Sequence, residues 1–140
     1  IQLERMPRWK AARQANAQRL WQTAAGCPGL RVHEVPPHCD HAAYKCYVFV
    51  EPERLAADWD RDRIMAAINA AGVPSFSGSC SEVYREKAFD GTGWRPAAPL
   101  PVARELGETS LMFLCHPTLT EDEIARTCAV LEEIMAQAGA

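Results

Sequence analysis

Apolar positions along the chain change period several times, and each change predicts a new element. Residues 1–24 have apolar side chains at helical spacing, among them Trp9 and Leu20, which share one face. Pro7 predicts a break or kink in this helix, because proline lacks the N–H that a helix interior uses. A Gly-Cys-Pro-Gly sequence at residues 26–29 predicts the end of the helix.

Four segments have the alternation or the composition of β-strands. Residues 30–36 alternate apolar and polar positions, and residues 43–50 are rich in β-branched and aromatic side chains. Residues 74–77 predict a short strand, and an apolar run that ends at Cys115 predicts a strand over residues 110–115.

Helices are predicted over residues 61–71, over residues 101–105 and after residue 120. Asp60 is a candidate N-cap for the first of them, and Gly107 predicts the end of the second. Thr120 and Glu123 have the spacing of a capping box, in which each side chain bonds the backbone N–H of the other residue. Residues 78–98 predict one or two helical turns followed by a loop.

Together these elements predict an α+β domain. The strands are few, and they alternate with helices that can cover one or two faces of a sheet. We therefore expect a small, largely antiparallel sheet covered by helices, with a long N-terminal helix and a C-terminal helix.

Composition narrows the class of protein. The 140 residues, of which 48% are hydrophobic, are enough for one domain with a core. A net charge of −3, with acids and bases interspersed, argues against a nucleic-acid partner, which would need a basic excess. No apolar run approaches the roughly 20 residues that cross a membrane. Because no signal peptide is visible, the six cysteines are predicted to be reduced thiols of a cytoplasmic protein.

A group of metal-ligating residue types raises the alternative of a zinc site. The group consists of His33, His38, Cys39, Asp40, His41 and Cys46. It contains no CxxC pair and no HExxH helix, and consecutive side chains on an extended backbone point to opposite faces. We therefore favour a polar loop over a metal site.

Three further motifs are compatible with catalysis, and each has a simpler structural interpretation. Cys80 lies in a Ser/Gly-rich turn typical of nucleophiles, but the sequence places no base beside it. The Gly-Thr-Gly at residues 91–93 lacks the Lys-Ser/Thr of a phosphate-binding loop. His116 is interpreted as a residue that fixes a turn, with Pro117 ending the strand before it. The residues alone therefore predict no complete active site.

The order of several short motifs carries more information than any one of them. The C-terminal third, PVARELGETSLMFLCHPTLTEDEI, contains a Pro-x-Ala-x-x-Leu helix, a strand, His-Pro, Leu-Thr and an acidic helix start. The first helix contains Gln-Leu and then Arg13 and Asn16, and HAAYKCYVFV begins the second strand. In this order the motifs resemble those of the DegT/StrS-type sugar aminotransferases, pyridoxal-phosphate (PLP) enzymes of the aspartate aminotransferase fold.

The resemblance implies that residues 1–140 form the small C-terminal domain of such an enzyme, with residues 1–24 leading from a large N-terminal domain. That large domain would hold PLP and its Schiff-base lysine, since Lys10, Lys45 and Lys87 lie in no similar context. The chain alone would then be inactive, because it lacks both the lysine and the acid at the pyridine nitrogen. The whole enzyme would be a homodimer that transfers an amino group, usually from glutamate, to a keto nucleotide-sugar.

In similar enzymes the small domain closes one side of the active-site cleft and helps to hold the nucleotide-sugar. By position, the resemblance implies substrate-binding roles for His41 and Tyr44 at the start of the second strand, and for Ser81 and Tyr84 in the loop after the third. Packing or surface roles are the alternative for each of them. Ala43 stands where many relatives have an aromatic residue, and SFSGSCSEVYREKAF replaces their Tyr-Pro-x-Pro-Leu-His stretch. These departures predict a different sugar or a different amine acceptor.

The competing interpretation is a non-catalytic module on the same scaffold that binds a small ligand or dimerises. Upstream sequence separates the two interpretations, because the enzyme requires a lysine in the context of a cofactor lysine. Without a large domain, the apolar face with Trp9 and Leu20 is expected to be exposed and to drive self-association.

Overall fold

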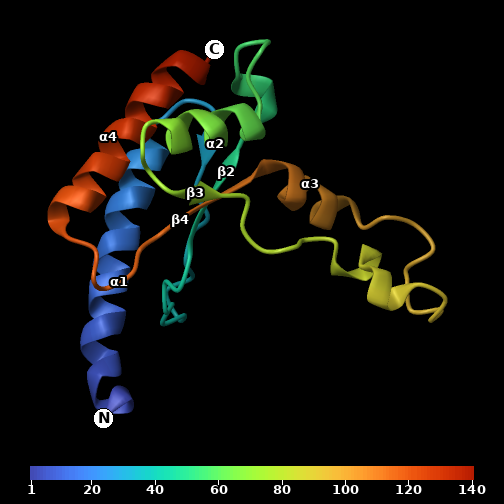
Figure 1. Cartoon of the computed structure of the whole chain (residues 1–140), viewed down its shortest axis with the longest axis horizontal. Helices are drawn as coiled ribbons and strands as arrows, with labels where there is room; N and C mark the ends of the chain where they lie inside the picture. The colour runs from blue at the N-terminus through green and yellow to red at the C-terminus, as the bar shows by residue number, and fades with distance from the viewer.

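The structure of the protein is a computed structural model that describes residues 1–140, with four α-helices and one small sheet (Figure 1). The helices are α1 (Gln2–Ala25), α2 (Arg61–Ala70), α3 (Pro101–Thr109) and α4 (Glu121–Ala138). The strands are β1 (Leu30–Arg31), β2 (Cys46–Val50), β3 (Ser75–Phe76) and β4 (Ser110–Phe113). All strand pairs are antiparallel, in the order β1-β2-β4-β3, so the predicted α+β fold is confirmed.

The two faces of the sheet differ, because successive side chains on a strand point in opposite directions. Cys46 and Val48 of β2 are fully buried and lie opposite Phe113 and Leu111 of β4, which are also fully buried. The two central strands therefore present one continuous apolar surface to the helices. Tyr47 points to the opposite face, where it is only half-buried.

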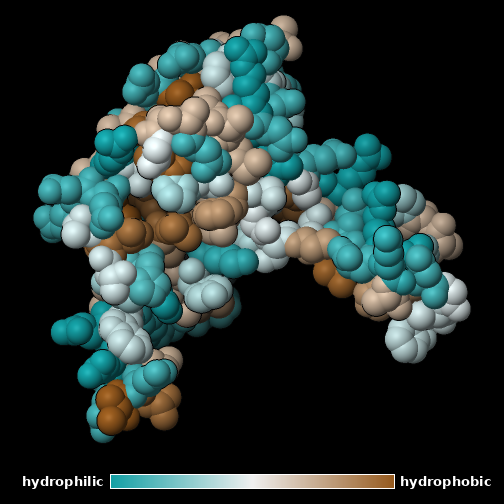
Figure 2. Space-filling model, in the orientation of Figure 1, coloured by the Kyte–Doolittle hydropathy of each residue, from teal (hydrophilic) through white to brown (hydrophobic).

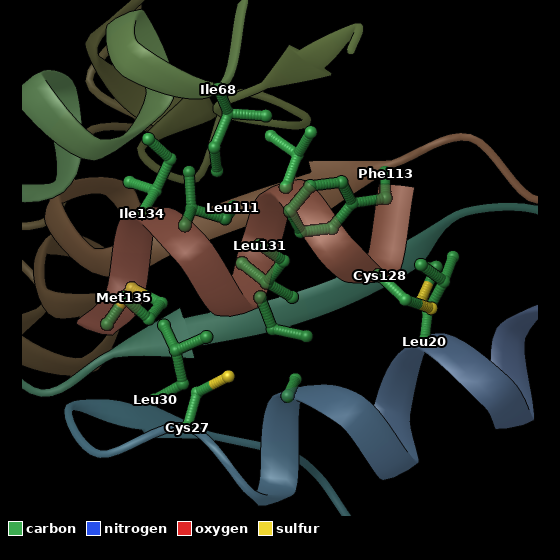
Figure 3. Close-up of a cluster of buried hydrophobic side chains, with 14 of the residues drawn as sticks. Leu20, Cys27, Leu30, Ile68, Leu111, Phe113, Cys128, Leu131, Ile134 and Met135 are labelled. Atoms are coloured by element: carbon green, nitrogen blue, oxygen red, sulfur yellow. The ribbon is translucent and has the colours of Figure 1, made fainter. Parts of the chain in front are cut away.

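Helices α1, α2 and α4 cover the apolar surface of the sheet, and α1 and α4 lie side by side (Figure 1). Figure 3 shows side chains from both of these helices meeting those of the strands. The largest fully buried side chains there are Phe113, Leu20, Ile64, Ile68, Leu111, Ile124, Leu131 and Met135. No residue from 77 to 108 is buried, so the core lies entirely outside that segment. None of the helices has the length and apolar character needed to cross a membrane.

Residues 77–100, which we call the arm, project away from the helices and return to the body through α3 (Figure 1). The two helical turns predicted here are present as the 3-10 turns η2 (Val83–Arg85) and η3 (Lys87–Phe89). Arg95 donates to the backbone carbonyls of Tyr84, Arg85 and Glu86 at 2.9, 3.0 and 3.1 Å. Polar bonds thus hold the arm in shape where no apolar core is present.

Two predicted boundaries within helices are wrong. α1 is unbroken at Pro7. Pro7 lacks the N–H that would bond the carbonyl of Leu3. Leu3 is exposed in the first turn of the helix, where water can donate to this carbonyl instead. α3 continues through Gly107 to Thr109. A Cβ at Gly107 would collide with the Ser81 hydroxyl, so this glycine permits a close approach of the arm instead of ending the helix.

The predicted strands are longer than the observed ones. The strand predicted over residues 30–36 pairs only at Leu30 and Arg31. Beyond Arg31, the indole N–H of Trp21 donates to the Tyr47 carbonyl at 3.0 Å, and its ring packs edge-on against His33 at 4.9 Å. The Trp21 side chain therefore occupies the place where these two segments would continue to pair.

The apolar face of α1 is not exposed in the way its sequence predicted. Leu20 is 0% exposed, because it packs into the core between the sheet and α4, and Trp9 is half-buried. The exposed apolar side chains of α1 are instead at its N-terminal end, where Figure 2 shows a hydrophobic cluster. They belong to Ile1, Leu3 and Met6. The prediction that Leu20 is exposed is therefore wrong, whereas self-association of the chain stays a prediction.

Candidate functional site

His41 lies in the loop that leads into β2, and two hydrogen bonds fix its position against α1. The Gln14 side chain donates to the His41 carbonyl at 2.8 Å. The Ala43 N–H donates to Nδ1 of His41 at 3.1 Å, so Nδ1 is the acceptor of the neutral ring and Nε2 carries the proton. The exposed imidazole therefore presents an Nε2–H donor to the surroundings.

Ala43 turns the chain so that Tyr44 points outward. Its φ of +46° lies in the left-handed region that few residues other than glycine adopt. The Cys115 thiol donates to the Ala43 carbonyl at 2.9 Å and thereby holds this turn to the end of β4. Tyr44 is 72% exposed, and the Arg13 guanidinium lies 5.7 Å from the centre of its ring. The predicted pair His41 and Tyr44 thus sits on a braced turn beside α1.

A cleft of about 400 Å³ separates α1 from this loop. It is lined by Gln14, Ala15, Gln18, Trp21, Val35, Cys39, His41 and Ala43, and we call it the histidine cleft. His33 packs beside it, with ring-centre distances of 4.9 Å to Trp21 and 6.0 Å to His41. Burial lowers the pKa of His33, and the neighbouring His41 lowers it further, so a neutral ring is favoured. The cleft accordingly offers an aromatic and largely uncharged wall.

The residue types that suggested a zinc site do not converge on a common point. Asp40 forms an ion pair with Lys10 on α1, and this hydrogen bond lowers the pKa of its carboxyl group. Cys46 is fully buried in the core, and burial raises the pKa of its thiol, which opposes the thiolate that a metal requires. No three His, Cys, Asp or Glu side chains are placed to hold a metal ion.

Ser81 and Tyr84 belong to the arm, and Ser81 lines a second cleft. This polar cleft has a volume of about 490 Å³ and is lined by residues 77–82, by Arg85, Glu86 and Lys87, and by Arg104, Gly107 and Glu108 of α3. The phenol of Tyr84 donates to Glu82 at 2.5 Å and accepts from the Leu100 N–H at 3.0 Å. Tyr84 therefore ties the two ends of the arm together.

Sequence reasoning missed the contact that joins these two regions. Lys45 donates to the Ser79 hydroxyl at 2.9 Å, and the Tyr47 phenol donates to the same oxygen at 3.2 Å. The Ser79 N–H in turn donates to the Tyr47 phenol at 3.0 Å. Burial raises the pKa of Tyr47, but the hydrogen bonds with Ser79 and the charge of Lys45 outweigh it, so the pKa lies below its usual value. The alternation that placed Lys45 and Tyr47 on one face of the strand was the available signal.

The four predicted site residues therefore form two groups. His41 and Tyr44 lie on the loop beside α1, whereas Ser81 and Tyr84 belong to the arm. His41 lines the histidine cleft and Ser81 lines the polar cleft. The structure does not bring all four side chains into one pocket of this chain.

The remaining candidate motifs have structural roles. The Cys80 thiol donates to Glu86 at 3.4 Å, and this hydrogen bond raises the pKa of Cys80, which weakens it as a nucleophile. His116 accepts from the Thr118 N–H and bonds its hydroxyl at 2.7 Å, while its carbonyl accepts from Asn16 at 3.2 Å. The prediction that His116 fixes a turn is confirmed, and Asn16 gains a reason to interrupt the apolar face of α1.

The three lysines of the chain lie in different settings. Lys10 is paired with Asp40, and Lys45 bonds Ser79. Lys87 is exposed on η3, at the surface of the arm. A Schiff-base lysine needs an unpaired amine beside the cofactor, and the pairing of Lys10 and Lys45 opposes this role for them.

Comparison with known proteins identifies the class. Residues 1–132 match the model of the DegT/DnrJ/EryC1/StrS aminotransferase family, so the chain belongs to this family. It is similar to an aminotransferase from Psychrobacter cryohalolentis, with 52% sequence identity and a TM-score of 0.90. That alignment covers 97% of this chain and 36% of the other.

Two more distant structures share the fold. DesV of S. venezuelae, solved with a ketimine intermediate, is 22% identical over 95% of this chain and 33% of its own, with a TM-score of 0.81. DesI, solved in the presence of its TDP-sugar product, is 20% identical over 96% of this chain and 33% of its own, with a TM-score of 0.79. The chain thus spans about a third of the length of these relatives. The predicted kinship with DegT/StrS-type aminotransferases is confirmed.

Proposed function

We propose that the chain is the small C-terminal domain of a PLP-dependent aminotransferase that acts on a keto nucleotide-sugar. The whole enzyme would take its amino group from a donor such as glutamate and work as a cytoplasmic homodimer. The match to the family over residues 1–132 carries this proposal. The TDP-sugar product of DesI supports the class of acceptor, and six unpaired cysteines suit a reducing compartment.

In this proposal the chain supplies contacts to the sugar and leaves the bond-making steps to the large domain. His41 would donate from Nε2–H to a sugar oxygen, since Nδ1 is already used by Ala43. Tyr44 is exposed beside Arg13, so its ring would pack against a sugar or base ring while the guanidinium would bind a phosphate. Ser81 would contribute a hydroxyl from the polar cleft. Tyr84, with both hydrogen bonds satisfied, would hold the arm in the geometry that presents Ser81.

PLP would be held by the large domain, because Lys10 and Lys45 are paired elsewhere and Lys87 lies exposed on the arm. When bound, PLP supplies an electron sink for the carbon from which the amino group departs. The residues of this chain would orient the acceptor and exclude water from one side of the cleft.

Comparing the full-length enzyme with the 140-residue chain tests the proposal. The full-length enzyme should retain PLP through dialysis and convert it to the amino form when glutamate is added. The 140-residue chain should retain no PLP under the same conditions. A full-length enzyme that neither binds PLP nor responds to an amino donor would overturn the proposal in favour of a non-catalytic module.

Substitutions then test the assigned residues in the full-length enzyme. His41→Gln and Ser81→Ala should raise the KM for the sugar acceptor while the reaction with glutamate is unchanged, because the sugar contacts are made only in the second half-reaction. Thr92→Val in the arm is the control, because its hydroxyl bonds only the backbone of its own turn. Unchanged acceptor KM values for both substitutions would remove these two residues from the site.

A further inference from the structure

Tyr47, which contacts the loop of residues 77–81, is held by ring stacking and by three hydrogen bonds. Its ring stacks on Phe49, with a centroid distance of 6.5 Å and an interplanar angle of 11°. Its carbonyl accepts from the Trp21 indole at 3.0 Å. Its phenol both donates to the Ser79 hydroxyl and accepts from the Ser79 N–H. The side chain thus connects the rigid sheet to a loop that contains no buried residue.

Gly78 adds a second, independent sign that the loop is built onto Tyr47. Its φ is +91°, a backbone conformation that residues with a Cβ rarely adopt. A Cβ at this position would collide with the ring and the oxygen of Tyr47. Lys45, two residues earlier on the same face of the strand, bonds the next loop residue, Ser79, at 2.9 Å. Backbone, ring and two side chains therefore fix one conformation of the loop.

The opposite side of the loop lines the polar cleft. Ser77, Ser79 and Ser81 are among its lining residues, together with three bases (Arg85, Lys87 and Arg104) and three acids (Glu82, Glu86 and Glu108). Neither Lys45 nor Tyr47 is among the residues that line the cleft. Any influence of Tyr47 on a molecule in the cleft must therefore pass through the loop.

We infer that Tyr47 is a positioning residue for the acceptor: its phenol holds Ser79, and thereby the loop of residues 77–81, so that Ser77 and Ser81 face the keto sugar. This inference rests on the function proposed above. Without its two bonds to the Tyr47 phenol, the loop would adopt the binding geometry in only a fraction of molecules. The apparent affinity for the acceptor would fall by that same fraction, and losing two such bonds corresponds to about tenfold.

The test uses the PLP-loaded full-length enzyme with Tyr47→Phe, which keeps the ring, and Met112→Leu as control. Met112 lies opposite Tyr47 in the sheet and makes no side-chain hydrogen bond with the loop. Probes are glutamate and, as acceptors, one TDP-linked and one UDP-linked 4-keto-6-deoxyhexose. Tyr47→Phe should raise the acceptor KM about tenfold and leave the glutamate half-reaction unchanged, whereas Met112→Leu should change neither. Lys45→Met, which removes one bond, should give a smaller increase in the same constant.

Hydrogen exchange of the same proteins separates positioning from folding. The Ser79 amide should exchange about tenfold faster in Tyr47→Phe, while amides of β2 and β4 keep their protection. A wild-type enzyme that reacts with glutamate and an acceptor, combined with an unchanged acceptor KM in Tyr47→Phe, would overturn the positioning role alone. A wild-type enzyme that reacts with glutamate but with neither acceptor overturns the sugar assignment and this inference together. Equal losses in both half-reactions would also overturn it, since a general structural defect is not specific for the acceptor.

Discussion

The body of the domain and the arm are held together by different forces. In the body, α1, α2 and α4 bury a cluster of 24 residues against one face of the sheet. In the arm, no residue is buried, and Arg95, Tyr84 and Ser79 hold the chain through hydrogen bonds exposed to water. Apolar burial contributes roughly 25 cal/mol per Å², whereas an exposed hydrogen bond contributes about 1 kcal/mol or less.

Most of the stability of the domain therefore comes from the body, whereas part of the candidate site lies in the arm. The body determines whether the domain folds, and the arm carries Ser81 and most of the polar cleft. Segments that bind ligands are commonly of low local stability, because they must adjust when a ligand enters. The hydrogen bond between Tyr47 and Ser79 then joins the stable body to the less stable arm.

Leucine truncation gives the largest expected difference between the two regions. Leu111→Ala should lower the free energy of unfolding by about 2–5 kcal/mol, because Leu111 is fully buried in β4 and its loss leaves a cavity. Leu100→Ala, in the arm, should cost under about 1 kcal/mol, because Leu100 is half exposed. Urea denaturation followed by circular dichroism measures both. Similar losses for the two variants would show that the arm is part of the folding core.

Two glycines with positive φ sharpen the boundary between arm and body. Gly78→Ala should destabilise the protein by about 1–3 kcal/mol, because the new Cβ is strained and collides with Tyr47. Gly91→Ala has a comparable φ of +70° but meets no atom within 4 Å. Its strain should stay within the arm and leave the urea midpoint unchanged. Equal shifts of the midpoint would mean that the backbone conformation alone, and not the contact with Tyr47, determines the cost at Gly78.

The sequence predicted the body well, because its signals are local and periodic. The capping box of Thr120 and Glu123 is present, with both of its hydrogen bonds. The helical and alternating patterns identified α2, α4, β2 and β4 within a few residues of their observed bounds. Such patterns succeed where burial on one face determines the choice of each side chain.

The arm and the contacts of the site could not be predicted in the same way. The bonds of Lys45 and Tyr47 to Ser79 join residues more than 30 positions apart, and no short pattern encodes them. Gly107 was read as a helix end, although its role is to admit Ser81. Leu20 is expected to be exposed in the absence of a large domain, but the sheet and α4, which lie elsewhere in the chain, cover it. A periodic pattern of side chains gives no information about contacts between residues that are far apart in the sequence.

Arg95 offers a test in which the arm changes and the body does not. Arg95→Ala removes three bonds to backbone carbonyls and an ion pair with Asp90. Amide exchange within residues 84–100 should accelerate about 5- to 30-fold, as expected for a local loss of one to two kcal/mol. The urea midpoint should move little. Arg104→Ala, which loses only an exposed ion pair with Glu108, is the control and should leave exchange in the arm unchanged. A lower midpoint for Arg95→Ala would show that arm and body unfold together.

The smallest expected effect is a difference between the pH at which Tyr47 of the body ionises and the pH at which Tyr84 of the arm ionises. Hydrogen bonds with Ser79 and the charge of Lys45 lower the pKa of Tyr47 despite its burial, whereas donation to Glu82 raises the pKa of Tyr84. Because its pKa is lower in the folded state, ionised Tyr47 adds to the free energy of unfolding above the unfolded pKa of about 10. This contribution is lost as the pH falls through the pKa of Tyr47 in the folded state. Protonated Tyr84 adds to the free energy of unfolding below pH about 10, and this contribution is lost as the pH rises through the pKa of Tyr84 in the folded state.

Raising the pH above about 10 should therefore loosen the arm at Tyr84 while the Tyr47 contact persists. Carbon-13 NMR of labelled tyrosine rings, assigned with single Tyr→Phe variants, should show Tyr47 ionising before Tyr84. Tyr47 and Tyr84 ionising at the same pH would contradict the hydrogen bonds of both residues. A reversed order would mean that the carboxylate of Glu82 is not the acceptor of Tyr84, and that the arm is closed by some other contact.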